Sequence, residues 1–167
     1  MSGIIGSSAN MNSGLAGAYP PGHVLQVKTF EGTGSSSTTG DLTVSNTYWS
    51  GSAYPSITVN SGNYIFVMLE FRYNIYGGSN DSQGTWHVYD ITNSASKGHY
   101  GNAYTAHTGN ETSGIWNYAG YAGQATALWT DSSAAAVQLS TRMIAASGGT
   151  LVFNGGNSHM IVMEVQA

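Results

Sequence analysis

Residues 64–76 constrain the fold of this chain most strongly, because they carry its longest β-strand pattern. Every second residue in this stretch is apolar: Ile65, Val67, Leu69, Phe71, Tyr73 and Ile75. Side chains that alternate with a period of two lie on one side of a strand. We therefore expect a long strand with this side against a core.

The opposite side of the same strand is apolar at one end only. It carries Tyr64, Phe66 and Met68, and then turns polar with Glu70 and Arg72. A second sheet can cover one side of such a strand, but the other side then needs a different partner. We interpret Tyr64, Phe66 and Met68 as candidates for a subunit interface.

The last 19 residues predict a second organising element. Residues 151–153 form a short β-rich run, and the glycine and asparagine residues at 154–157 predict the turn of a hairpin. Residues 159–165 are apolar on both faces until Glu164, which is typical of a central strand in a packed sheet.

Shorter patterns fill the rest of the chain. They predict strands at residues 23–30, 42–44, 48–49, 57–59, 85–91, 125–129 and 134–146, a loop at 31–41, and no assigned element over most of 92–127. Short strands separated by Gly, Ser and Asn, with almost no helical pattern, predict an all-β fold. We expect an antiparallel, jelly-roll-like β-sandwich at residues 21–167, preceded by an extended N-terminal arm at residues 1–20.

Composition excludes several classes of partner. Only 7% of residues are charged, against about 25% in ordinary soluble domains, while 41% are hydrophobic and 11% aromatic. These values predict a folded chain with a neutral, hydroxyl-rich surface. Four Lys and Arg residues are too few for nucleic acid or a membrane surface. The chain has no cysteine, and no apolar run approaches the roughly 18 residues of a membrane span.

The sequence predicts no catalytic residue, no metal site and no cofactor. The five histidines lie far apart and form no pair with the spacing typical of a zinc site. Eight carboxylates are available for a glycosidase-type pair, but no motif marks one.

Two segments are candidates for contacts with other molecules. In the arm, isolated apolar residues are typical of anchors on neighbouring chains: Ile4, Ile5, Met11 and Leu15. The alternative is that this segment is a disordered leader. The second segment places aromatic residues among Gly, Asn and Thr: Tyr100, Tyr104, Trp116, Tyr118 and Tyr121. Rings with polar groups suit recognition of sugars or protein surfaces, although they also pack under loops and in subunit contacts.

Both ends of the chain resemble a known family. Four segments carry the resemblance: the leader at residues 4–14, the run Pro20-Pro21-Gly22-His23-Val24-Leu25-Gln26-Val27, the run Gly149-Thr150-Leu151-Val152-Phe153 and the ending Met160-Ile161-Val162-Met163-Glu164-Val165. They are similar to small virion structural proteins of tailed phages, notably marine and cyanobacterial ones. The similarity covers about a quarter of the chain.

This resemblance implies a jelly-roll-like, oligomeric protein of the virion, assembled in the host cytoplasm. We expect a homotrimer that decorates or cements the capsid, held by its arm to the major capsid protein or other virion proteins. The alternative is a receptor-binding module at a tail-fibre tip that binds host surface glycans.

Overall fold

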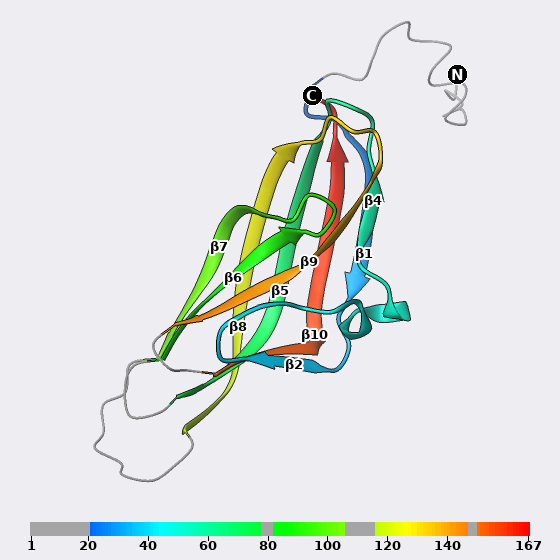
Figure 1. The fold of residues 1–167 in the computed structure, drawn as a ribbon. Coiled ribbons are helices and arrows are strands. Elements are labelled where there is room, and N and C mark those ends of the chain that lie inside the picture. Colours follow the sequence, from blue (N-terminus) through cyan, green and yellow to red (C-terminus); the bar gives the residue numbers. More distant parts are fainter. Residues whose placement is uncertain (1–20, 78–81, 106–115, 147–149) are drawn as a thin grey trace, which may run out of the picture.

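The computed structural model describes residues 21–77, 82–105, 116–146 and 150–167, and this part of the chain is all-β (Figure 1). The strands are β1 (Val24–Glu31), β2 (Ser35–Thr38), β3 (Asp41–Thr43), β4 (Ser56–Thr58), β5 (Tyr64–Gly77), β6 (Ser82–Asp90), β7 (Ala95–Thr105), β8 (Trp116–Thr130), β9 (Ala136–Ala146) and β10 (Thr150–Val165). Two short 3-10 turns, η1 (Asn46–Tyr48) and η2 (Ser50–Ser52), lie between β3 and β4. Within the described ranges, no helix could cross a membrane.

The strands pair in a nested order. β1 pairs with β10, β3 and β4 pair with β9, β5 pairs with β8, and β6 pairs with β7, all antiparallel. A chain paired in this way is one long hairpin, and folding the hairpin over itself adds the pairs β5·β10 and β6·β9. One layer then has the order β1-β10-β5-β8, and the other contains β7, β6 and β9 with β3 and β4. A pairing of β7 with β8, at His99 and Thr126, joins the two layers along one edge. This arrangement is a jelly roll, and it confirms the predicted antiparallel sandwich.

The core lies between the two sheets. Ile65, Val67, Leu69 and Phe71 of β5 are each at most 1% exposed, which confirms the predicted inward side of this strand. Phe71 stacks on Trp86 of the opposite sheet, with the ring centroids 5.2 Å apart. The inward side chains of β5 therefore hold the two sheets together, because they pack against the facing sheet.

The predicted C-terminal hairpin is wrong. β10 continues through residues 154–157, and its two halves pair with β2 and β1 on one side and with β5 on the other. A Cβ atom at Gly155 would lie 2.4 Å from the backbone oxygen of Thr33. The glycine therefore allows two backbones to approach closely and does not serve a turn. The prediction that residues 159–165 form a central strand is confirmed, since they lie between β1 and β5.

Three further predictions differ from the structure. β2 lies inside the predicted loop at 31–41, and both β7 and most of β8 lie in the unassigned stretch. The strand predicted at 48–49 is replaced by the 3-10 turns, with Trp49 buried and its Nε1 donating to Ser140 Oγ at 3.2 Å. Burial of the indole and an isolated antiparallel bridge between Trp49 and Gly32 hold this segment in place. The predicted arm, residues 1–20, lies outside the described residues.

Candidate interaction surface

The sheet β1-β10-β5-β8 presents an apolar surface on the side away from the core. Residues directly opposite each other on neighbouring strands share a face, so the register defines rows that cross all four strands. The first row is Val24, Val165, Tyr64 and Thr130; the second is Val27, Met163, Phe66 and Leu128; the third is Thr29, Ile161, Met68 and Thr126. We call these three rows the outer face.

The apolar side chains of the outer face are open to solvent. Leu128 is 58% exposed, Val27 53% and Met68 42%, and Phe66 between them is half-buried. Strands spaced about 4.8 Å apart and rows about 6.8 Å apart give this face a footprint of about 400 Å². A patch of this size is within the range, about 300–600 Å², in which the largest patch of a monomer is often functional.

Polar residues close the outer face at one end. The next row along the strands is Glu31, His159, Glu70 and Gln124, all exposed. A shallow hollow lies on this border between the third row and the polar row, lined in part by Met68, Ile161, Glu70 and His159. The surface is therefore apolar over three rows and is bordered by the row that contains Glu31 and Glu70. We call this polar row the charged margin, and it limits how far an apolar partner can extend.

A buried carboxylate holds the other end of this sheet from the core side. Oε1 of Glu164 accepts hydrogen bonds from the Asn60 backbone N (2.8 Å), Asn60 Nδ2 (3.1 Å) and Asn63 Nδ2 (2.7 Å), and Oε2 accepts one from Gln26 Nε2 (2.7 Å). Burial raises the pKa of this carboxyl, but the hydrogen bonds from Asn60, Asn63 and Gln26 outweigh burial and lower the pKa below its usual value. The cluster ties β1 and β10 to the turn before β5 and so fixes the first two rows of the outer face.

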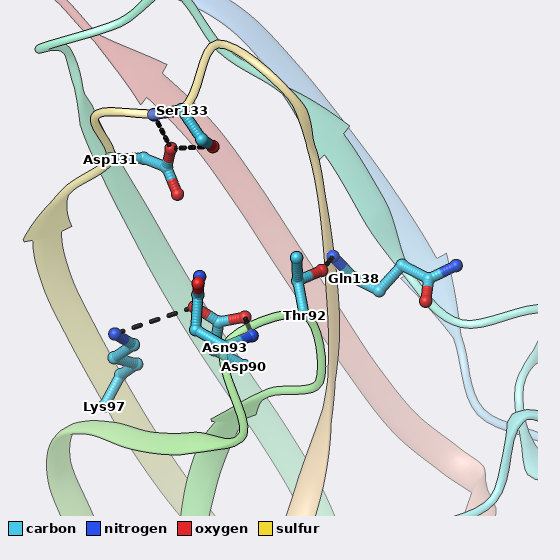
Figure 2. Close-up of polar contacts among 7 residues, drawn as sticks. All are labelled: Asp90, Thr92, Asn93, Lys97, Asp131, Ser133 and Gln138. Atoms are coloured by element: carbon cyan, nitrogen blue, oxygen red, sulfur yellow. Dashed lines mark hydrogen bonds and ion pairs between the residues drawn. The ribbon is translucent and has the colours of Figure 1, made fainter.

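The other buried carboxylates serve turns (Figure 2). Asp90 accepts hydrogen bonds from the backbone N and Nδ2 of Asn93, at 2.9 and 2.8 Å, and lies 3.6 Å from Lys97 Nζ. Asp131 accepts hydrogen bonds from the backbone N and Oγ of Ser133. Each carboxylate thus holds the turn that follows its own strand. Among the described residues, no group of three or more His, Asp or Glu could hold a metal ion.

The structure brings the predicted interface residues together with others that the sequence did not single out. Tyr64, Phe66 and Met68 all lie on the outer face. Val27 and Leu128 lie in the same row as Phe66 but belong to β1 and β8, and no sequence pattern indicates that these strands share a sheet with β5. Alternation within β8 could have placed Leu128 on the side away from the core. In the structure Leu128 is exposed, and its neighbours Ala127 and Trp129 are buried and half-buried.

The aromatic candidates lie on two strands. Tyr100 and Tyr104 belong to β7, and Trp116, Tyr118 and Tyr121 belong to β8. The β8 residues pair with residues 73–77 of β5, at the end of the sandwich far from the C-terminus (Figure 1). Their side chains lie outside the described part of the structure, as do the arm residues Ile4, Ile5, Met11 and Leu15.

No protein-family model and no curated protein matches this sequence.

Proposed function

We propose that this chain is a non-enzymatic structural protein of a bacteriophage virion. In this proposal it decorates or cements the capsid as a homotrimer, through contacts with its own copies and with the major capsid protein or other virion proteins. The observation that carries the proposal is the outer face, a broad apolar surface on a rigid sheet that suits permanent contact with other subunits.

The energetics of the outer face support assembly. Covering this mostly apolar footprint of about 400 Å² stabilises a complex by at most about 10 kcal/mol before the entropic cost of association is subtracted, at about 25 cal/mol per Å². Jelly rolls recur in viral capsid proteins, and the sequence resemblance to tailed-phage virion proteins points to the same setting. The carboxylates buried in the described ranges hold the structure together, which fits a structural role.

Localisation on intact particles tests this function. Gold-labelled antibody against the protein should label the heads of the phage particles in electron microscopy, and the mass of the purified protein should correspond to three copies. Particles that carry no label would overturn the proposal. A stable monomer at micromolar concentration would contradict the trimer but not the location.

The second candidate function is glycan binding at a tail-fibre tip. It is favoured by the aromatic residues of β8, Trp116, Tyr118 and Tyr121, which pair with residues 73–77 of β5 at the end of the sandwich far from the C-terminus. A glycan array should then show binding that is lost in Trp116→Ala and Tyr118→Ala. Tyr64→Ala is the matched control, because Tyr64 lies on the outer face at the other end. Label at the tail tip would favour this candidate, and label over the head would contradict it.

A further inference from the structure

The outer face is smaller than one side of a stable interface between two rigid domains. Its footprint of about 400 Å² is about half of the roughly 800 Å² that each partner contributes to a standard interface. Flat packing of one outer face on another would therefore have to bury the charged margin with Glu31 and Glu70. A partner that fits the apolar rows alone must be narrow.

The segment before Pro21 joins the sandwich close to the outer face. Gly22 N donates to Gln166 O and Gln166 N donates to His23 O, both at 2.8 Å, so the chain enters the sandwich beside the end of β10. Val24, in the first row of the outer face, follows three residues after Pro21. The segment therefore starts at the uncharged end of this face.

The same segment has a matching chemistry. Residues 1–20 contain no Asp, Glu, Lys or Arg, and the three rows of the outer face contain none either. In an extended chain, Ile5, Met11 and Leu15 would share one side. Met11 and Leu15 would then lie about 14 Å apart, which is the separation of the first and third rows.

The length of the segment favours a neighbouring copy over its own. Tyr19 and Pro20 each precede a proline, and a residue in that position favours extended conformations over helix. Leu15 lies six residues before Pro21 and Ile5 lies sixteen before it, distances of up to about 20 and 55 Å along an extended chain. The outer face is only about 20 Å long, so the segment reaches beyond its own sheet and can lie across the next one.

We propose that residues 1–16 of one copy lie extended across the outer face of the neighbouring copy, with Ile5, Met11 and Leu15 on its apolar rows. Each copy then gives one segment and receives another, which closes a ring of copies and doubles the contacts of each subunit without burying Glu31 or Glu70. This proposal rests on the proposed function, since it names the partner surface within the homotrimer.

Two variants of the full chain test this exchange by mass. The segment variant I5S/M11S/L15S has an intact outer face, and the face variant M68D/L128D has an intact segment. Each variant alone should be a monomer, measured by native mass spectrometry and sedimentation. An equimolar mixture should form a complex of two chains and nothing larger, because one segment and one face remain available to each pair.

Matched controls and opposite outcomes make the test decisive. A16S/A18S in the segment and Gln138→Asp, at an exposed position of the other sheet, should keep the mass of the unmodified protein, and circular dichroism should show that all variants keep the sandwich. The proposal is overturned by a mixture that stays monomeric, by a segment variant that stays oligomeric, or by an unmodified protein that is itself monomeric. Gold labelling of particles is independent of these masses, so failure of the exchange and failure of the virion role can be told apart.

Discussion

Replacing Glu164 by glutamine should destabilise the protein, because the carboxylate is buried and its charge and hydrogen bonds are changed together. Glu164 is 3% exposed and accepts four hydrogen bonds, three at Oε1 and one at Oε2. Glutamine has almost the same shape, so the substitution changes charge and hydrogen-bonding capacity while leaving the packing intact.

The cost of this substitution follows from the contacts. The amide of glutamine offers a single acceptor oxygen. If that oxygen keeps the hydrogen bonds from Asn60 and Asn63, the NH₂ group of the new glutamine faces the NH₂ group of Gln26. Gln26 Nε2 also donates to Thr58 O at 2.6 Å, and turning the Gln26 amide would sacrifice that bond. Hydrogen bonds to a charged group stabilise by about 1.5–3 kcal/mol and neutral ones by about 0.5–1.5. Because a neutral amide is also cheaper to bury, we expect a net loss of about 2–3 kcal/mol in the free energy of unfolding.

The pH dependence gives this prediction a second readout. Since the folded pKa of Glu164 lies below its usual value of 4.5, the unfolded chain takes up a proton at higher pH than the folded chain does. The stability that the carboxylate contributes is complete above about pH 4.5 and is lost as the pH falls through the folded pKa. The difference between the unmodified protein and Glu164→Gln should therefore be constant from pH 7 to pH 5 and shrink below pH 4.5.

Urea unfolding followed by tryptophan fluorescence measures both effects. Glu70→Gln is the control, because Glu70 is exposed on β5 and should change the free energy of unfolding by less than about 0.5 kcal/mol. A loss below about 0.5 kcal/mol for Glu164→Gln at pH 7, or a difference that persists unchanged at pH 3, would refute the role of the charged, hydrogen-bonded carboxylate.

Two further substitutions test other parts of the structure. Gly155→Ala should lower the free energy of unfolding in urea by about 2–3 kcal/mol, because the new Cβ would collide with the Thr33 backbone. Gly156→Ala is the control and should lower it by less than about 0.5 kcal/mol, because the space around Gly156 is open. Equal effects of the two substitutions would contradict the close approach of the two strands. Asp41→Asn removes the exposed ion pair with Arg142 and should cost at most about 1 kcal/mol. At 1 M salt, Asp41→Asn should lower the free energy of unfolding by less than it does at low salt. An effect of the substitution that does not change with salt would contradict an electrostatic contribution.

The candidate surface was only partly predictable from the sequence. Tyr64, Phe66 and Met68 could be assigned to one side of β5, because strand alternation is a local property of the chain. Val27 and Leu128 could not be added to them, because β1 and β8 are separated by about a hundred residues and become neighbours of β10 and β5 only in the folded sheet. The surface is therefore a product of strand order, which no local pattern encodes.

The C-terminal error has a similar cause. The sequence Asn-Gly-Gly-Asn is a good turn signal by local conformational preference, yet β10 continues through it. Glycine serves two physical purposes, positive φ and close approach of another backbone, and a sequence alone cannot separate them. At Gly155 the deciding atom is the carbonyl oxygen of Thr33, more than a hundred residues away.

By itself, the sequence determined that this chain forms an antiparallel β-sandwich with β5 packed against a core, and that one end of β5 is apolar on both sides. These properties follow from side-chain periodicity and composition, which act over a few residues. The tertiary structure decided the rest: the nested pairing of a jelly roll, the continuation of β10 through an irregularity at residues 154–159, the enclosure of Glu164 by Gln26, Asn60 and Asn63, and the gathering of four strands into one outer face. Each of these depends on contacts between residues far apart in the chain, so their free energy exists only once the sheets have formed.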